Sequence, residues 1–407
     1  MTEKESNPVP VLRRFKPYPS YKDCGVERLG EIPEHWKILA LKRICRLGYG
    51  DSLSEDKRRD GDFAVYGSNG PVGIHDRSNA LGPCLVVGRK GSFGKINYSP
   101  DPVFAIDTTF IVDSRYTSVD LRWLYFALTW LRLDSVSKDS AIPGLDREDA
   151  YACLVPACSV EEQREIASFL DRETVKIDTL IAKKERLIEL LHEKRTALIT
   201  HAVTKGLDPN VPMKDSGVEW LGNIPAHWKV KMLKRLAFMR AGTAITSEEI
   251  ESVDEYPVFG GNGIRGYTGS FTHDGAYPLV GRQGALCGCV NFASGKFWAS
   301  EHAVVAAPNA SVDPHWLANL LQAMSLNSYS QSAAQPGLAV ETIGAIMAPF
   351  SALDEQHAIT AFLDRETERI DRLITKIHEA IERLKEYRIA LISAAVTGKI
   401  CVLSERL

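Results

Sequence analysis

Four blocks of this 407-residue sequence occur twice, in the same order and at a nearly constant separation. The block KDCGVERLGEIPEHWKILALKR at 22–43 returns as KDSGVEWLGNIPAHWKVKMLKR at 214–235, which is 192 residues later. The longest block, EQREIASFLDRETVKIDTLI, begins at Glu162 and returns as EQHAITAFLDRETERIDRLI from Glu355. Solenoid repeats recur every 20–50 residues or so, and a period this long therefore indicates duplication of a whole module.

The other two blocks are rich in glycine. VYGSNGPVG at 65–73 matches VFGGNGIRG at 258–266, and VGRKGSFGKINY at 87–98 matches VGRQGALCGCVNF at 280–292. Each half of the chain therefore combines a globular region that carries glycine-rich loops with one copy of the longest block.

Composition excludes several classes of protein. Apolar residues make up 44% and charged residues 25% of the chain, as in ordinary globular domains. Lys and Arg number 49 against 52 Asp and Glu, and any nucleic-acid site must therefore depend on local patches. Of the eight cysteines only Cys287 and Cys289 are close in sequence, which predicts reduced thiols and no metal site. Without a signal peptide or a transmembrane run, we expect a cytoplasmic protein with no membrane partner.

The globular regions have a mixed pattern. Short apolar runs at 84–88, 110–112 and 277–281 are bounded by Gly or Asp and predict strands. Apolar residues at three-to-four spacing predict helices over 119–131 and 312–324. We therefore expect two α/β (α+β) domains.

Two long helices are predicted after these regions. Ser159-x-x-Glu162 and Ser351-x-x-Asp354 match the capping-box pattern at their beginnings, and a glycine follows each predicted end. Apolar residues recur at seven-residue spacing, with Lys184 interrupting the first series, and this predicts a coiled-coil seam. The predicted seam residues are Leu170, Ile177, Leu191, Leu198, Leu363, Ile370, Ile377, Leu384 and Leu391.

The two matched helices are each other's natural partners. Antiparallel pairing would join the tandemly duplicated domains by a coiled coil with pseudo-two-fold symmetry, whereas the alternative is that each helix lies solvated on its own domain. About 38 helical residues would make a rod of roughly 57 Å, long enough to hold two modules along a DNA duplex. The predicted domains are 1–155, a spacer helix at 156–206, a second domain at 207–350, a second spacer helix at 351–400 and a tail at 401–407.

Candidate ligand contacts lie in the matched segments. An arginine between close glycines offers a planar donor group to phosphate or guanine, and asparagine in the other glycine-rich loops has the donor and acceptor that adenine requires. Basic pairs after each HW dipeptide would contact phosphates. For all of them an ordinary turn or a solvated surface is an equally open interpretation. The candidate DNA-binding residues are Lys42, Arg43, Asn69, Arg89, Lys90, Lys234, Arg235, Asn262 and Arg282.

Motifs for catalysis are missing from the sequence. It contains no GxxxxGK[ST] loop, no GxSxG, no HExxH and no Asn-Pro-Pro-aromatic motif. His35-Trp36 and His227-Trp228 recur, and we interpret the tryptophans as core residues and the histidines as hydrogen-bonded structural residues. We therefore predict no catalytic residues and no cofactor on this chain.

The duplicated IPxHW blocks, the Gly-Arg loops and the paired FLDRET-x-x-ID-x-LI … ALI-x-x-AVT segments resemble the specificity subunit of type I restriction-modification enzymes. The resemblance covers nearly the whole chain. It implies two target-recognition domains, each contacting one half of a split site in double-stranded DNA. It also implies a coiled coil that sets the spacing and docks two methyltransferase subunits, which endonuclease-translocase subunits join. S-adenosylmethionine, ATP and Mg would bind those partners, and the complex would defend the host against foreign DNA.

The two halves diverge outside the matched blocks, as TTFIVDSRYTS at 108–118 and HAVVAAPNASV at 302–312 illustrate. This predicts different bases in the two half-sites. One alternative is a non-catalytic coiled-coil scaffold that presents two ligand-binding domains to protein partners. An enzyme with duplicated active sites is less compatible, because no constellation of several His, Cys or carboxylate side chains recurs in both halves outside the helix blocks.

Overall fold

The computed structural model describes residues 15–135, 144–284, 287–330 and 337–403. The chain divides into two compact units. The first unit contains the chain up to Lys184 and from Glu379 onward, and the second unit contains Glu185–His378. Residues 1–14 of the predicted first domain and 404–407 of the predicted tail lie outside the described residues.

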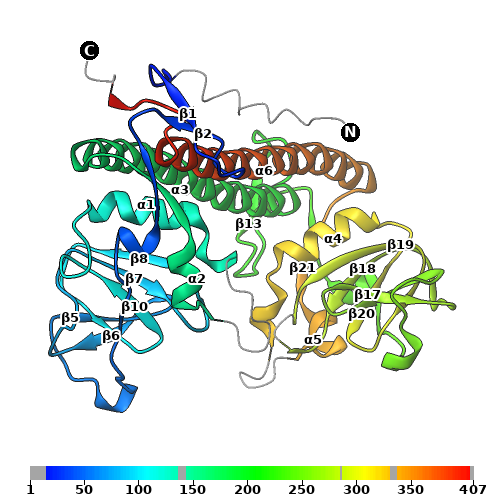
Figure 1. The fold of residues 1–407 in the computed structure, drawn as a ribbon. Coiled ribbons are helices and arrows are strands. Elements are labelled where there is room, and N and C mark those ends of the chain that lie inside the picture. The colour runs from blue at the N-terminus through cyan, green and yellow to red at the C-terminus, as the bar shows by residue number, and fades with distance from the viewer. Residues whose placement is uncertain (1–14, 136–143, 285–286, 331–336, 404–407) are drawn as a thin grey trace. The chain divides into compact units, whose positions relative to one another are not determined.

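Small sheets form the globular part of the first unit (Figure 1). Four strands pair in the order β4-β10-β7-β8, three in the order β6-β5-β9, and β1-β2 and β3-β11 form two-stranded sheets. The strands are β1 (Tyr21–Asp23), β2 (Glu31–Pro33), β3 (Lys37–Ala40), β4 (Gly48–Tyr49), β5 (Phe63–Gly67), β6 (Gly70–His75), β7 (Cys84–Gly88), β8 (Ile96–Ser99), β9 (Phe104–Ala105), β10 (Thr109–Val112) and β11 (Leu154–Ala157). Its short helices are η2 (Leu41–Arg43), η3 (Glu55–Lys57), α1 (Leu121–Leu131), η4 (Leu133–Ser135) and α2 (Arg147–Ala152).

The second unit carries corresponding elements in the same sequence order. Its main sheet has six strands in the order β15-β20-β18-β19-β16-β17, beside the pairs β12-β13 and β14-β21. The strands are β12 (Met213–Asp215), β13 (Asn223–Pro225), β14 (Lys229–Met232), β15 (Ala237–Ala241), β16 (Tyr256–Gly260), β17 (Gly263–Thr268), β18 (His273–Gly281), β19 (Val290–Ala299), β20 (Ala303–Pro308) and β21 (Met347–Phe350). The short helices are η5 (Leu233–Arg235), η6 (Ser247–Glu249), α4 (Pro314–Ala323), η8 (Leu326–Tyr329) and α5 (Val340–Ala345).

Strand β19 explains why one unit has a continuous six-stranded sheet and the other has two smaller sheets. β19 pairs with β18 along one edge and with β16 along the other. In the first unit the equivalent stretch is split into β8 and β9, and Pro100 and Pro102 lie between them. Proline has no N–H to donate to a neighbouring strand, so it interrupts the pairing that Ser294 and Lys296 allow in the second unit.

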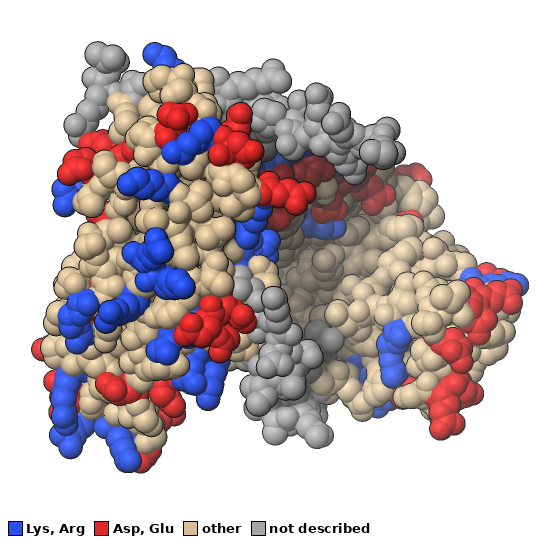
Figure 2. All heavy atoms as spheres, viewed as in Figure 1, with Lys and Arg blue, Asp and Glu red and all other residues tan. Residues whose placement is uncertain are grey.

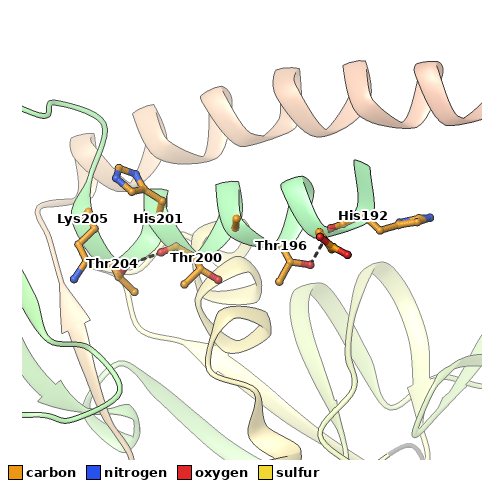
Figure 3. Close-up of a pocket in the computed structure, with 8 residues that line it drawn as sticks. His192, Thr196, Thr200, His201, Thr204 and Lys205 are labelled. Atoms are coloured by element: carbon orange, nitrogen blue, oxygen red, sulfur yellow. Dashed lines mark hydrogen bonds between the residues drawn. The ribbon is translucent and has the colours of Figure 1, made fainter. Parts of the chain in front are cut away.

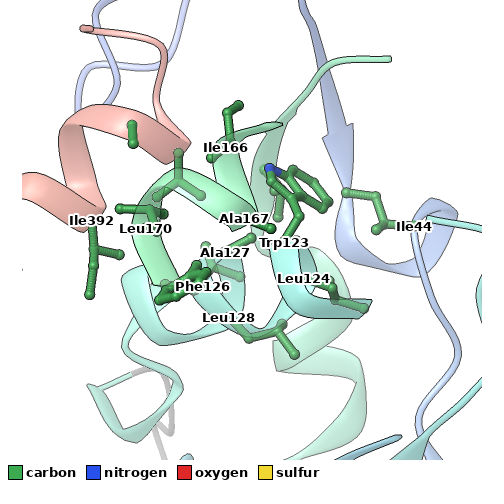
Figure 4. Close-up of a cluster of buried hydrophobic side chains, with 14 of the residues drawn as sticks. Ile44, Trp123, Leu124, Phe126, Ala127, Leu128, Ile166, Ala167, Leu170 and Ile392 are labelled. Carbon is green, nitrogen blue, oxygen red and sulfur yellow. The ribbon is translucent and has the colours of Figure 1, made fainter. Parts of the chain in front are cut away.

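Helices α1 and α4 pack on the main sheets, close to where the sequence predicts helices. Asp120 and Asp313 cap them: the carboxylate of Asp120 accepts a hydrogen bond from the backbone N–H of Trp123, and that of Asp313 accepts one from the backbone N–H of Trp316. The buried face of α1 packs against the Ile166–Leu170 stretch of a long helix, as Figure 4 shows around Trp123. Burial of such a face contributes about 25 cal/mol per Å² of apolar surface.

The two long helices are α3 (Val160–Lys205) and α6 (Leu353–Val396), and each contributes to both units. In the first unit Leu170 shares a core with Leu391 and Ile392, and Arg388 donates to Asp178 at 2.9 Å. In the second unit Ile199 shares a core with Leu363, and Arg195 donates to Asp371 at 2.8 Å. Within each unit, the segment of α3 therefore pairs with a segment of α6 that runs in the opposite direction.

The predicted seam residues differ in burial. Along α3, Leu170 and Ile177 are buried, whereas Leu191 and Leu198 are half-buried. Along α6 the buried members are Leu363, Ile370 and Leu391, and the half-buried members are Ile377 and Leu384.

The helix beginnings differ from the capping-box pattern. Ser159 Oγ accepts from Glu162 N at 3.2 Å, but the Glu162 carboxylate bonds to the globular part instead of returning to the Ser159 backbone. Ser351 is buried and its Oγ has no partner within the described residues, because α6 begins two residues later, at Leu353. Both ends follow the prediction: Gly206 and Gly398 have φ of +78° and +72°.

The glutamates of the capping-box positions anchor each long helix to its unit. Glu162 accepts from Trp36 Nε1 at 3.1 Å and from Tyr18 OH at 2.7 Å, and its other oxygen lies 3.1 Å from His35 Nε2. Glu355 takes the same position beside His227 and Trp228. Burial and the Glu162 hydrogen bond raise the pKa of Tyr18, which therefore stays a proton donor. The interpretation of these tryptophans and histidines as structural residues is confirmed.

Candidate nucleic-acid interface

The Gly-Arg segment of the first unit is a closed loop between β7 and β8. Gly88 N donates to Lys95 O and Gly94 N donates to Gly88 O, both at 2.8 Å. Gly94 has φ of +75°, and a Cβ there would come within 2.1 Å of Asp134 N. Only glycine fits this approach, and the loop therefore holds Arg89 at a fixed point.

The second unit builds the same loop between β18 and β19. Gly281 N donates to Cys289 O and Gly288 N to Gly281 O, both at 2.8 Å. Gly288 has φ of +86°, and a Cβ there would come within 2.4 Å of Asn327 N. Arg282 accordingly occupies the position of Arg89.

The surroundings of the two arginines differ. The guanidinium carbon of Arg89 lies 5.0 Å from the centre of the Tyr49 ring, and that of Arg147 lies 5.1 Å from the same ring. Arg89 also donates to the backbone oxygen of Asp107 at 2.9 Å. In the second unit, Ala241 pairs with β20 where Tyr49 pairs with β10, and α5 begins with Val340 where α2 begins with Arg147.

The asparagine hairpins lie against these loops. In the first unit Lys95 Nζ donates to Asn69 Oδ1 at 2.8 Å, and Ser68 Oγ and Arg89 N both donate to the backbone oxygen of Thr108. The structure therefore brings together the loops of Asn69, Arg89 and Lys90, which are 20 residues apart in sequence.

The second unit has a pocket of about 260 Å³ at this place. It is lined by Asn262, Arg265, Gln283 and His302 together with glycines and Ile264. His302 Nδ1 lies 3.3 Å from Gln283 Oε1. The amide, imidazole and guanidinium groups at this pocket provide donors and acceptors of the kind that recognise base edges.

The predicted basic pairs lie elsewhere on each unit. Lys42 and Arg43 are exposed on η2, and Lys234 and Arg235 are exposed on η5. No described hydrogen bond, ion pair or pocket joins them to the glycine-rich loops. Their role as phosphate contacts stays a prediction.

The balance of basic and acidic residues differs between the two units. The first unit has 32 Lys and Arg against 31 Asp and Glu, whereas the second has 17 against 21. On the face in Figure 2, acidic and basic side chains are interspersed, and no single basic surface spans it. Any attraction to an anionic ligand must therefore be local.

The first unit also holds an ion pair between a buried carboxylate and a partly exposed arginine. Asp113 is fully buried and accepts from Leu81 N, Arg115 N and the Arg115 guanidinium. Burial raises the pKa of Asp113, but the hydrogen bonds and charge of Arg115 outweigh it, so the pKa lies below the usual value. The equivalent position in the second unit is Ala307.

Each unit also has a hollow along one long helix. In the first unit a pocket of about 870 Å³ lies between α1, the Gly94 loop and α6, and its lining includes Trp130, Arg388, Ile389 and Ile392. In the second unit a pocket of about 770 Å³ lies on α3. Thr196, Thr200 and Thr204 point to one side of α3 there, away from His201 (Figure 3).

Sequence reasoning missed several residues that lie beside the candidate contacts. Tyr49, Arg147, Arg265, Gln283 and His302 were not among the candidates. Gln283 was detectable because it aligns with Lys90, whereas Arg147 lies 58 residues from Arg89 and only the fold brings the two to one ring.

Other kinds of site are not found in the described ranges. No group of three His, Cys, Asp or Glu side chains there is arranged to hold a metal ion. No described helix is long and apolar enough to cross a membrane.

Each of the two units is a mixed α/β fold that carries an arginine on a glycine-rich loop.

Comparison with known proteins shows which proteins have a similar sequence and fold. Residues 225–383 match the model of the type I restriction modification DNA specificity domain. The EcoprrI specificity subunit of Escherichia coli is 42% identical over 161 residues, which cover 39% of this chain and 39% of that protein. The MjaVIII specificity subunit of Methanocaldococcus jannaschii is 22% identical over 259 residues, or 57% of this chain and 55% of that protein. The chain thus aligns with only about two-fifths to just over half of the length of these relatives.

The same relationship holds for the fold. A chain from a solved structure on complex assembly and conformational transition of the type I R-M system superposes with a TM-score of 0.70 at 14% identity. The superposition covers 90% of this chain and 98% of that one. Residues 225–383 are therefore similar to the type I restriction modification DNA specificity domain, and the likeness over most of the chain is one of fold.

Proposed function

We propose that this chain is the DNA-recognition subunit of a type I restriction-modification complex, and that each unit recognises one half of an asymmetric bipartite site. One observation carries the proposal: both units hold an arginine at the same point of the same glycine loop, Arg89 and Arg282, but surround it with different side chains. A shared framework with different contact residues is what recognition of two different half-sites requires.

The candidate DNA contacts fall into two groups under this proposal. Arg89, Lys90, Asn69, Asn262 and Arg282 lie on the glycine loops and hairpins and would approach the bases or the nearest phosphates. The exposed pairs Lys42-Arg43 and Lys234-Arg235 would hold the DNA backbone at a second place on each unit.

We further propose that the halves arose by tandem duplication and that α3 and α6 form an antiparallel coiled coil along their length. The opposite running of the helix segments within each unit supports this, as do the buried seam positions Leu170, Leu363 and Leu391. The domain limits would be those predicted from sequence: recognition domains at 1–155 and 207–350, and spacer helices at 156–206 and 351–400.

The helices would set the distance between the two half-sites. Inserting four residues into either helix lengthens it by about 6 Å. At about 3.4 Å per base pair, the gap in the recognised sequence should grow by roughly two base pairs. An unchanged gap with full activity would contradict this spacing role.

Two methyltransferase subunits would dock on the helices, and endonuclease-translocase subunits would join them. The hollows along α6 in the first unit and α3 in the second are suitable surfaces. Catalysis, S-adenosylmethionine, ATP and Mg would then belong to the partners, and the complex would act on DNA in the cytoplasm.

Sequencing methylated adenines in genomic DNA, with and without the gene for this chain, tests the proposal. We expect one bipartite, asymmetric motif to lose methylation when the gene is removed. Exchange of residues 207–350 for those of a relative should change only one half of the motif. Unaltered methylation would favour a protein scaffold instead.

A further inference from the structure

Tyr49, Arg89 and Arg147 lie together in the first unit although they are far apart in the sequence. Tyr49 lies on β4, and its side chain is 51% exposed. Both guanidinium carbons lie about 5 Å from its ring centre, at 5.0 Å for Arg89 and 5.1 Å for Arg147. An aromatic ring attracts cations to its faces and so holds both planar groups in defined orientations.

Among the described residues, only one of the two positive charges has an acidic partner, and that partner is not hydrogen-bonded to it. Arg89 bonds to the backbone oxygen of Asp107 and makes no described ion pair. Arg147 Nε lies 3.8 Å from Glu148 Oε1, beyond hydrogen-bond distance, and this buried nitrogen has no described hydrogen-bond partner. Two like charges held at one ring repel each other unless an anion lies between or beside them.

The backbone fixes the position of this group. Arg89 N donates to Thr108 O at 2.8 Å, and Leu145 N donates to Arg89 O at 2.8 Å, so the segment that leads into α2 is tied to the glycine loop. Lys90, which is exposed, adds a third cation next to Arg89. A rigid backbone lowers the entropy lost when the side chains bind a ligand.

We propose that Arg89 and Arg147, held by Tyr49, form a phosphate clamp that fixes the DNA backbone on the first unit. This inference rests on the proposed function and adds a positioning role, distinct from base recognition, that the second unit lacks. Ala241 and Val340 replace Tyr49 and Arg147 there, so no second arginine shares an aromatic ring with Arg282 at those positions.

The salt dependence of DNA binding by the full chain tests the clamp. Each phosphate contact contributes about 0.9 to the slope of log K against log salt concentration. We measure fluorescence anisotropy of a labelled random-sequence duplex between about 50 and 200 mM KCl, where such slopes are well defined. Arg147→Gln should flatten the slope by about 0.9 and weaken binding at 0.1 M salt roughly fivefold to tenfold. Arg89→Gln should do the same.

Matched variants separate the clamp from a loss of folding. Arg147→Lys keeps the charge and should keep the wild-type slope, whereas Tyr49→Phe keeps the ring and should bind as wild type does. Arg186→Gln removes an exposed charge on α3, far along the chain from the group around Tyr49, and should change nothing. Thermal unfolding of each variant must match wild type.

Three outcomes would overturn the clamp. Wild-type slopes in both glutamine variants would show that neither arginine contacts a phosphate. Weakening on only some sequences would assign the pair to a base. If the wild-type chain binds no duplex at all, the proposed function itself is contradicted. If the wild-type chain binds and both glutamine variants keep its slope, only the clamp is contradicted.

Discussion

In the first unit Arg89 lies against Tyr49 beside a second arginine, whereas in the second unit Arg282 lies near Gln283 and His302. The loops that carry these arginines have the same hydrogen bonds, the same left-handed glycines and the same close approach to a helix end. The framework is therefore common to both units, and the difference is confined to side chains that project from it. Such a division lets a recognition site change without loss of the fold.

The largest expected effect concerns the common framework. Trp36→Ala and Trp228→Ala each remove a fully buried ring and leave a glutamate, buried Glu162 or half-buried Glu355, without its indole donor. Each should lower the free energy of unfolding by about 4 kcal/mol. Urea unfolding measures this. A large difference between the two variants would show that the two frameworks are not equivalent.

The next largest effect is expected at the two pockets along the long helices, where the two units carry different side chains. Ile389 is 66% exposed in the pocket of the first unit, and Thr196 holds the matching place in the second. If a methyltransferase subunit covers Ile389, Ile389→Asp should weaken that contact by about 2 kcal/mol, or roughly 30-fold. Native mass spectrometry would count the partners retained. Ile389→Val is the control, and full occupancy with the aspartate variant would contradict docking there.

Low pH should lower the folding stability of the first unit when Asp113 becomes protonated. Because the pKa of Asp113 is lower in the folded state, its stabilisation is present above the unfolded pKa of about 3.9 and is lost as pH falls through the folded value. Asp113→Asn should cost about 2 kcal/mol at pH 7 and reduce the loss of stability below about pH 4. Unfolding at several pH values measures this, with the exposed Asp107→Asn as control. Equal pH profiles for wild type and Asp113→Asn would refute it.

The smallest effect should come from Gln283 and His302 at the pocket of the second unit. Gln283→Ala or His302→Ala should cost about 1–2 kcal/mol and relax the preference at one base pair. The salt slope should not change, in contrast to the arginine variants of the first unit. Methylation of a library with a randomised site gives the preference. Uniform weakening on all sequences would remove these residues from base recognition.

Several features of the protein follow from the sequence alone. The apolar spacing predicts helices α1 and α4, the glycines mark the ends of α3 and α6, and the IPxHW blocks indicate the buried tryptophans. These predictions succeed because hydrophobic periodicity and left-handed glycine conformations are local properties of the chain. The candidates Arg89, Asn69 and Asn262 were found for the same reason, since each lies in a glycine-rich turn.

Tertiary structure alone decided the partners of those residues. Glu162 matches a capping-box pattern, but its carboxylate bonds to Trp36 and Tyr18, which are 126 and 144 residues away. Likewise, only folding brings Arg147 to the Tyr49 ring, which Arg89 also contacts. Local pattern cannot specify such contacts, because the energy of a hydrogen bond or a cation on a ring depends on distance in space and is independent of separation along the chain.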